Sequence, residues 1–335
     1  MNVVFFHRHP VTNVTFGIEQ YFETVRSFLP GKIETSVAVS RHLSTSVWRC
    51  AYNAAEAAFR QGDVNHITGD IHYVAFLLRK RKTLLTIHDC GFEEHPSAVK
   101  RAILKWFWLQ IPLKRVSRVV TDSEFSKQRI VALSGCDPEF VQVVPICISP
   151  MFRAIHRTFN ASYPSILQVG TTPNKNLERT AAALKELPCR LIIVGPLSGA
   201  QQAMLESSNL DWLNLAGLSD EELLKVYGES DIVVFASTYE GFGMPIIEAN
   251  VVGRPVITSK VASMPEVAGN SACLVDPYSV ESIRESVIHV IKDEPYRKQL
   301  VENGFLNALR FRPEVIAADH LEIYRQLWRK ERNSI

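Results

Sequence analysis

Two glutamates eight positions apart, Glu240 and Glu248, enclose a turn that could hold a diphosphate. Gly241 and Gly243 allow the backbone to approach a ligand closely, and Pro245 presets the first turn of a helix. A helix that begins here offers unpaired N–H groups and the positive end of its dipole to an anion. Glu248 then falls in the first turn, where its carboxylate can reach the hydroxyl groups of a ligand. The competing interpretation is an ordinary helix start with a solvated acid, since glutamate is common in first turns for dipole reasons alone.

The elements that must position this turn are a strand before it and a helix after it. Residues 231–236 form an apolar run typical of a short buried parallel strand. Met244, which we expect at the helix cap, has no hydroxyl or carboxylate, so a capping box does not account for Glu248. Beyond the helix, residues 253–259 predict a tight turn and another apolar strand.

A second loop lies upstream and follows the same plan. Residues 166–169 predict a strand, and a short loop rich in glycine, threonine, proline and asparagine separates it from a helix over 177–187. Further strand and helix signals follow at residues 190–196 and 213–223. In the second of these segments, Ser219 and Glu222 have the spacing of a capping box, which explains both residues without any ligand.

On these residues the chain resembles the retaining glycosyltransferases of family four, which have the type-B fold (GT-B) and carry an E-x7-E element of the form EGFG-x-P-x-x-E. The resemblance implies an α/β protein of two Rossmann-like domains that face a central cleft. It also implies a nucleotide-diphosphate sugar as donor, and retention through same-face attack assisted by the donor phosphate itself. The match runs through nearly the whole carboxy-terminal half and touches the amino-terminal half at scattered points.

The resemblance also implies roles for individual residues of the donor site. Lys175 would bind the diphosphate, Glu240 the sugar hydroxyls and Glu248 the ribose, whereas the alternative for Lys175 is an exposed loop lysine. Further donor-binding residues are expected in the same loops, at Gly170, Thr171, Gly217, Gly241, Phe242, Gly243 and Met244. Many relatives have an arginine where this chain has Thr171, so it stays open whether one cation or two neutralises the leaving group.

In the amino-terminal half, His88 follows an apolar run and precedes Asp89. This places it at the carboxyl end of a parallel strand, where open α/β sheets bind ligands. The His-Asp step resembles that of many relatives, in which the histidine faces the donor sugar. A neutral imidazole there would hydrogen-bond a sugar hydroxyl. His88 is therefore a third catalytic candidate, beside Lys175 and Glu240. The alternative is a histidine with only a structural role. Arg8, Gly17 and Ser123 are further candidates for the acceptor side or the cleft, at a strand end, a glycine loop and a capped helix start.

Length and composition agree with two domains. The 335 residues are 46% hydrophobic and 21% charged, as in an ordinary globular protein with room for two cores. Apolar runs that alternate with helical segments predict parallel sheets. In the amino-terminal half these runs lie near Val3, Val37, Val64, Leu84, Val119 and Val141. We expect an acceptor-binding domain over 1–158, completed by a terminal helix within 313–335, and a donor-binding domain over 159–312.

Cysteine usage and hydropathy narrow the class further. The six cysteines are spread singly with no C-x-x-C pair, so neither a zinc site nor a disulfide framework is indicated, and we expect reduced, mostly buried thiols. No window approaches eighteen uninterrupted apolar residues, so we expect a cytoplasmic protein. We find no paired-carboxylate motif suited to magnesium or manganese, so no metal and no cofactor beyond the donor are expected.

Basic charge is concentrated in one stretch of the amino-terminal half. Between Arg79 and Arg118, ten lysines and arginines face three acids, a net of +7 in a chain whose total is +2. Residues 99–111 predict a helix with aromatic and apolar residues on one side and cations on another, which suits an anionic membrane surface. An amphipathic helix whose aromatic side lies in the core is the alternative of equal weight. No nucleic-acid-binding module accompanies the charge, so nucleic acid is not expected as a partner.

These patterns predict a retaining glycosyltransferase that moves a sugar from a nucleotide-diphosphate donor to a hydroxyl of a glycan or lipid-linked acceptor, working in the cytoplasm or on the inner face of the membrane. The alternatives are a nucleotide-sugar epimerase of the same fold and a catalytically silent regulator that binds nucleotide sugar. The EGFG-x-P-x-x-E form favours a transferase. Two departures slightly favour the catalytically silent regulator. One is Thr171, and the other is the single Gly17 in a loop where relatives often have two glycines.

Overall fold

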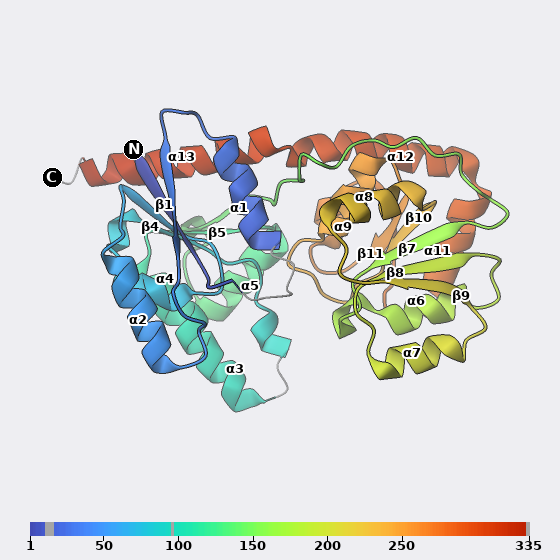
Figure 1. Cartoon of the computed structure of the whole chain (residues 1–335), viewed down its shortest axis with the longest axis horizontal. Helices are drawn as coiled ribbons and strands as arrows, with labels where there is room; N and C mark the ends of the chain where they lie inside the picture. The colour runs from blue at the N-terminus through green and yellow to red at the C-terminus, as the bar shows by residue number, and fades with distance from the viewer. Residues whose placement is uncertain (11–16, 95–96, 333–335) are drawn as a thin grey trace. The chain divides into compact units, whose positions relative to one another are not determined.

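The computed structural model describes residues 1–10, 17–94 and 97–332, which form two units (Figure 1). One unit comprises Met1–Cys147 together with Pro313–Ile335, and the other comprises Ile148–Arg312. Each unit is built on one six-stranded sheet, and all strand pairs in both sheets are parallel. The predicted α/β class with two Rossmann-like domains is therefore confirmed.

The first sheet has the strand order β2-β1-β3-β4-β5-β6. Its strands are β1 (Asn2–His7), β2 (Glu34–Val39), β3 (Val64–Ile67), β4 (Thr83–Thr86), β5 (Arg118–Thr121) and β6 (Val141–Val143). Each of the six apolar runs predicted in this half of the chain is a strand. Because all six run in parallel, their carboxyl ends share one edge of the sheet.

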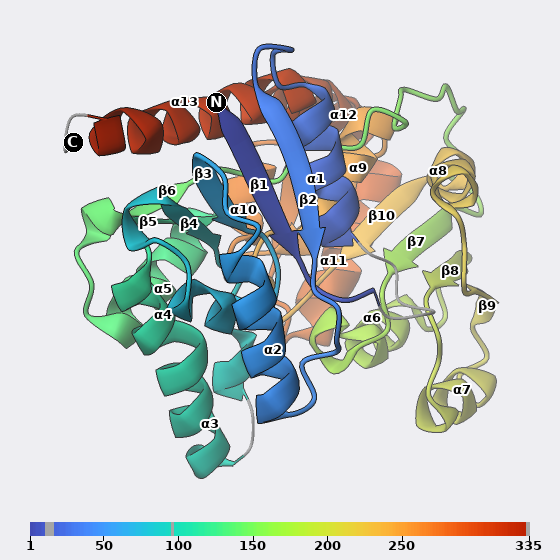
Figure 2. The same ribbon diagram turned by 60° about the vertical axis from the view of Figure 1, so that its left-hand side comes forward.

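Helices cover both faces of this sheet, as Figure 2 shows for α1 and α13 on one side and α2 to α5 on the other. On β1, Val3 and Phe5 join the core beneath α1 and α13, whereas Val4 and Phe6 join the core beneath the other helices. The split follows from the alternation of successive side chains along a strand. The helices are α1 (Gly17–Ser27), α2 (Val47–Ala58), α3 (Ala98–Leu104), α4 (Ile111–Arg115), α5 (Glu124–Ser134) and α13 (Pro313–Arg332).

Buried polar contacts tie the terminal helix α13 to this sheet. The Tyr324 hydroxyl lies 2.8 Å from Nδ1 of His66, whose Nε2 lies 2.7 Å from the Thr86 hydroxyl. Nε2 of His320 lies 2.8 Å from the Tyr21 hydroxyl. Burial lowers the pKa of His66 well below its usual range and that of His320 to about 3, so both rings are neutral. The carboxy-terminal helix thus packs on the amino-terminal unit with its polar groups hydrogen-bonded to that unit.

The basic aromatic segment is not a single regular helix. α3 passes into a wider π-helical turn over Lys105–Gln110 (η4), and α4 follows. Leu109 is buried and Trp108 packs partly buried against the core, whereas Trp106 and Phe107 are 58% and 49% exposed. One part of the aromatic side therefore packs against the core, and the other part is exposed.

The second sheet has the strand order β12-β11-β10-β7-β8-β9. Its strands are β7 (Ser165–Val169), β8 (Arg190–Val194), β9 (Asp211–Leu215), β10 (Ile232–Phe235), β11 (Val256–Ser259) and β12 (Ala272–Val275). Its helices are α6 (Leu177–Leu184), α7 (Gly199–Glu206), α8 (Asp220–Glu229), α9 (Met244–Val252), α10 (Met264–Ala268), α11 (Val280–Lys292) and α12 (Glu294–Ala308). In Figure 1, α6 and α7 lie on one side of the sheet, and α8, α9 and α12 lie on the other.

The boundary between the units lies at Cys147 rather than at residue 158. The connecting residues belong to the second unit because they pack on it: the Ile155 N–H donates to the Val252 carbonyl oxygen at 3.3 Å, and the Phe152 ring meets that of Tyr227 at a centroid distance of 5.8 Å. The sequence offered no signal for this, since the segment has no helix or strand of its own.

All six cysteines are free thiols; Cys50 and Cys136 are half-buried and the other four are buried. Within the described ranges, no helix is both long and apolar enough to span a bilayer.

Candidate active site

Lys175 and Glu240 form an ion pair in the second unit, with Nζ 2.7 Å from Oε1. Lys175 ends a short 3₁₀ turn, Pro173–Lys175 (η6), after β7, and Glu240 lies in the loop after β10. β7 and β10 are neighbours in the sheet although β8 and β9 come between them in sequence, so their carboxyl ends bring the two loops together. The side chains are 20% and 14% exposed, which leaves them accessible to a ligand and only partly screened.

Two asparagines that sequence reasoning passed over hold these loops together. Asn174 donates from Nδ2 to the Tyr239 carbonyl oxygen at 3.0 Å and to Oε1 of Glu240 at 3.2 Å. Asn176 has a left-handed backbone with φ of 63°, and its Nδ2 donates to the Ala236 carbonyl oxygen at 2.9 Å. Asparagine tolerates this conformation and its side chain hydrogen-bonds to neighbouring backbone groups. The sequence Pro-Asn-Lys-Asn could therefore have indicated that these asparagines hold the loop.

Gly170 makes room for the lysine. Its φ is +95°, and a Cβ there would lie 2.9 Å from carbon atoms of the Lys175 side chain. The aliphatic part of Lys175 therefore passes over this glycine, and its Nζ lies 4.7 Å from the centroid of the Phe235 ring. A larger residue at 170 would displace the cation from the loop.

Thr171 follows Gly170 in the same loop. Its hydroxyl donates to the Pro196 carbonyl oxygen at 2.5 Å, and its own carbonyl accepts from Nε2 of Gln201 at 2.8 Å. The threonine side chain thus fixes the loop to the residues after β8. Lys175 is the cation that this loop supplies.

The helix start after Glu240 differs by one residue from the sequence-based assignment. Gly243 is the cap, with φ of +117°, so Met244 is the first helical residue and Pro245 the second. No side chain caps the helix there. The Phe242 side chain is buried and meets the Phe311 ring at 5.6 Å, which leaves the backbone of Phe242 as the part that can face a donor.

Glu248 lies one turn into α9 and is half-buried. The Tyr227 hydroxyl on α8 donates to its Oε2 at 2.6 Å. Burial raises the pKa of Glu248 to about 7, against the hydrogen bond from Tyr227 and the charge of Lys175, which both lower it; the charge of Asp220 adds to the increase. A titration near neutrality in a helix start is typical of functional carboxylates.

The turn after β9 is exposed at Gly217, whose φ is +70° and around which an added Cβ would meet nothing. The capping box predicted at the start of α8 is confirmed: Ser219 accepts from the Glu222 N–H at 3.3 Å, and Glu222 accepts from the Ser219 N–H at 2.7 Å. These two side chains cap the helix, and the backbone at Gly217 is left for ligand contact.

In the first unit, His88 follows β4 and both its ring nitrogens have partners. Nδ1 lies 2.8 Å from Oδ2 of Asp122, and Nε2 lies 3.0 Å from the Thr68 carbonyl oxygen. Burial disfavours the charged ring, but the charge and hydrogen bond of Asp122 outweigh it and raise the pKa of His88 to about 9. With an ionised Asp122, both ring nitrogens face acceptors, which favours a ring protonated on both nitrogens over the neutral imidazole expected from the sequence.

The other amino-terminal candidates are engaged within the first unit. Arg8 donates from Nε to Oε1 of Glu19 at 2.9 Å. His7, which precedes Arg8 at the end of β1, is buried, which lowers its pKa to about 4 and leaves it neutral. Ser123 caps α5 and accepts from the Ser126 N–H at 3.1 Å. Gly17 is the exposed first residue of α1, and most of the loop before it lies outside the described residues.

Residues 156–306, most of the second unit, match the family model described as glycosyl transferases group 1. This part of the chain is therefore similar to the group 1 glycosyltransferases. The chain is 26% identical to O-antigen chain mannosyltransferase B of Escherichia coli over 277 residues, which cover 74% of this chain and 71% of the relative.

Solved structures extend the likeness to the whole chain. Sucrose-phosphate synthase from Thermosynechococcus elongatus matches with a TM-score of 0.79 at 16% identity, over 98% of this chain and 99% of that one. HepE from Anabaena, solved in complex with UDP and glucose, matches with a TM-score of 0.76 at 16% identity, over 97% and 100%. The fold of the chain is thus GT-B. Among the residues that the structure describes, no group of three or more His, Cys, Asp and Glu side chains could hold a metal ion.

We predict that Asp122→Asn lowers the pKa of His88 from about 9 to below its unfolded value of about 6.5, because burial then acts without the compensating charge. A group with a raised folded pKa stabilises below the unfolded pKa and loses that stabilisation as pH rises through the folded pKa. The wild type should therefore lose stability between about pH 6.5 and 9 at this site, and the variant should not.

Histidine-selective NMR titration and urea unfolding across that range would measure both effects. The exposed His289 in the second unit serves as an internal control, since it lies in another unit than Asp122 and its resonance should be the same in the two proteins. A wild-type His88 that titrates below its unfolded pKa would contradict the ion pair.

Proposed function

We propose that the protein is a retaining, metal-independent glycosyltransferase of the family-four type that transfers a hexose from a nucleotide-diphosphate sugar to a glycan hydroxyl. The observation that carries the proposal is the Lys175–Glu240 ion pair beside the open start of α9, with Glu248 one turn further on. The sequence similarity to an O-antigen mannosyltransferase favours mannose as the transferred sugar, and a surface polysaccharide or its lipid-linked precursor as the product.

In this proposal the reaction needs a stabilised leaving diphosphate and a stabilised sugar cation. Lys175 has three N–H donors, so it can keep its bond to Glu240 and still bind a phosphate oxygen. The helix start at Gly243 adds backbone N–H groups and a positive dipole end. Glu240 would order the sugar hydroxyls and Glu248 the ribose.

The proposed steps involve no protein nucleophile. The bond between the anomeric carbon and the β-phosphate oxygen breaks, and the acceptor oxygen forms its bond to that carbon from the same face. The proton of the acceptor hydroxyl passes to the departing phosphate oxygen. The products are the glycosylated acceptor, with the anomeric configuration kept, and a free nucleoside diphosphate.

The surface of the first unit supports a lipid-linked acceptor. Trp106, Phe107 and Ile103 are about half exposed on α3 and η4, and Val47 and Trp48 on α2 are 82% and 86% exposed. An apolar groove of about 470 Å³ lies between these helices, lined by side chains that include Val47, Cys50, Ala54, Ile103, Phe107 and Trp108. From residue 97 to 118 the chain has six cations and no acid. Apolar side chains surrounded by cations suit an anionic lipid surface.

The test of the function is a donor panel of uridine, guanosine and adenosine diphosphate sugars, mannose forms included, with a soluble mannose-terminated acceptor and its polyprenyl-linked form. We expect release of nucleoside diphosphate together with a glycosylated acceptor of retained configuration, in the presence of EDTA as in its absence.

Other outcomes of the panel would favour other functions. Conversion of the donor sugar without a glycosylated product would indicate an epimerase, and binding without turnover would indicate a silent regulator. Activity that EDTA abolishes and a divalent ion restores would overturn the metal-independent mechanism.

The donor site itself is tested by Lys175→Ala and Glu248→Ala. Loss of the lysine removes a charge-assisted hydrogen bond worth about 1.5 to 3 kcal/mol, so binding of the nucleoside diphosphate should weaken by about ten- to a hundredfold. Calorimetric titration would measure it, with Lys185→Ala, an exposed lysine of the same unit, as the matched control. Wild-type affinity in both site variants would mean that the donor binds elsewhere.

Membrane association is tested by sedimentation with anionic liposomes. Each cation near an anionic surface contributes about 1 kcal/mol, so changing Lys100, Arg101 and Lys105 to glutamine should reduce binding sharply. Binding of the wild type should also fall as salt rises, because salt screens the attraction.

The matched control changes three exposed lysines of the second unit, Lys225, Lys260 and Lys292, to glutamine. It removes the same charge and should leave sedimentation unchanged. A wild type that fails to sediment at low salt would make a soluble acceptor the better proposal.

A further inference from the structure

Glu248 has a long side chain whose direction depends on its neighbours. Its carboxylate is reached from α8 by Tyr227 and lies within the electrostatic influence of Asp220, also on α8, and of Lys175 from the loop before α6. The 2.6 Å hydrogen bond from Tyr227 is the contact that fixes where the carboxylate lies. A carboxylate has about four lone-pair positions, so one bond to a phenol leaves capacity for two ribose hydroxyls.

Tyr227 is itself held rigidly. It is fully buried, and its ring meets that of Phe152 edge-on at a centroid distance of 5.8 Å. A tyrosine has only two side-chain torsions, so once its ring is packed the hydroxyl has a defined position. Burial places the pKa of Tyr227 well above its usual range, so the phenol keeps its proton and acts as the donor.

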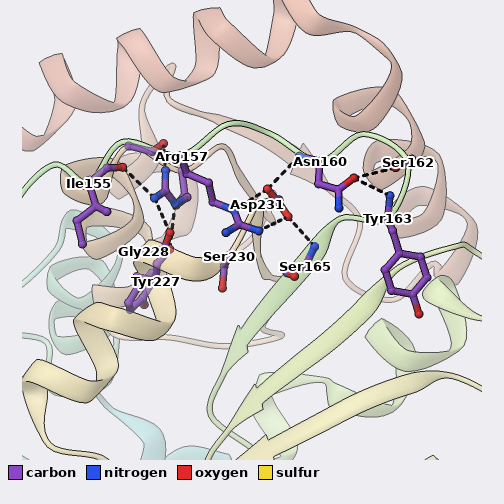
Figure 3. A network of polar contacts seen from close by, with 12 residues as sticks. Ile155, Arg157, Asn160, Ser162, Tyr163, Ser165, Tyr227, Gly228, Ser230 and Asp231 are labelled. Carbon is purple, nitrogen blue, oxygen red and sulfur yellow. Dashed lines mark hydrogen bonds and ion pairs between the residues drawn. The ribbon is translucent and has the colours of Figure 1, made fainter.

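The backbone of Tyr227 is held by a buried arginine. Arg254, which is 4% exposed, donates from Nε to the Tyr227 carbonyl oxygen at 2.9 Å and from an Nη to that of Gly228 at 2.9 Å. These carbonyls belong to the last turn of α8, where main-chain acceptors lack helical partners. Arg254 also donates to the Ile155 carbonyl oxygen at 2.9 Å, and Figure 3 shows Ile155, Tyr227 and Gly228 gathered around these bonds.

Arg254 is also bonded to the end of the helix that carries Glu248. It directly follows Gly253, the left-handed cap of α9, and its N–H donates to the Ala249 carbonyl oxygen at 2.9 Å. The guanidinium therefore ties the end of α8 to the end of α9. Burial lowers the pKa of Arg254 to about 10, so the group stays charged at neutral pH.

We propose that Tyr227 is the positioning residue for the donor-binding glutamate: its hydroxyl, held through Arg254, directs the Glu248 carboxylate to the ribose. The inference rests on the proposed function, since it requires Glu248 to bind the donor. If the bond only joined α8 to α9, its loss would change stability and leave donor affinity and its pH dependence unchanged.

The test is Tyr227→Phe, with Tyr163→Phe as the matched control. The Tyr163 hydroxyl also donates to a carboxylate, Oδ2 of Asp211, at 2.9 Å in the same unit. Uridine and guanosine diphosphate are titrated by calorimetry from about pH 5.5 to 8.5, a range that spans the titration of Glu248. Wild-type affinity should fall as pH drops through about 7, because a protonated Glu248 is a weaker acceptor.

In Tyr227→Phe, affinity at neutral pH should fall about tenfold, the equivalent of one hydrogen bond. The midpoint of its pH dependence should move upward, because the bond that lowers the pKa of Glu248 is gone. KM for the donor should rise while kcat stays near the wild-type value. Tyr163→Phe should match the wild type in all of these.

A second variant, Arg254→Lys, keeps the charge but loses the planar fork that reaches several carbonyls. It should also weaken donor binding. The double variant with Tyr227→Phe should bind the nucleoside diphosphate no more weakly than Tyr227→Phe alone, because both changes act through the same Tyr227 hydroxyl. Additive losses would overturn the role of Arg254.

The outcomes separate this inference from the function on which it rests. A folded Tyr227→Phe with wild-type affinity and pH midpoint, beside a Glu248→Ala that binds weakly, would overturn the positioning role alone. If Glu248→Ala also binds as the wild type does, the proposed donor site fails with it.

Discussion

The structure depends on one geometric constraint: in a parallel sheet, the carboxyl ends of neighbouring strands meet at the same edge, whatever their distance in sequence. In the second unit this constraint brings the loop after β7 to the loop after β10 and produces the Lys175–Glu240 ion pair. Gly170 and Asn174 then adjust the two loops to each other, one by leaving space and one by hydrogen bonding. The candidate donor site is a consequence of strand order.

The same constraint has a different outcome in the first unit. β3, β4 and β5 are adjacent, so the Thr68 carbonyl, His88 and Asp122 meet at their carboxyl ends. The two acceptors on either side of the ring make His88 a buried cation. A charged imidazolium cannot act as a base, and both of its N–H groups are engaged, so in the proposed reaction this residue would contribute positive charge.

Buried polar groups carry much of the arrangement around α9. Arg254 is held by main-chain carbonyls, and Arg157 beside it forms a forked pair with Asp231 that fixes the connecting segment to the start of β10 (Figure 3). A buried guanidinium is tolerated only where its donors are satisfied, and the ends of helices supply acceptors that lack partners. The elements around α9 are thus joined by the hydrogen bonds of these two arginines as well as by apolar contact.

The sequence by itself determined the class of the protein. Apolar runs of strand length alternating with helical segments indicated two parallel sheets, and glycine, proline and glutamate spacing marked the turn before α9, because these signals are local and each follows from backbone conformation or side-chain period. Only the tertiary structure decided which polar groups are paired and charged. The partners of His88, Thr171 and Glu248 lie on other elements. The pKa values of His88 and Glu248 depend on burial and on the charges and hydrogen bonds of the residues packed around them. The division of the aromatic segment, with Trp108 against the core and Trp106 exposed, was likewise undecidable from periodicity, because a π-helical turn breaks the 3.6-residue repeat that the sequence pattern assumes.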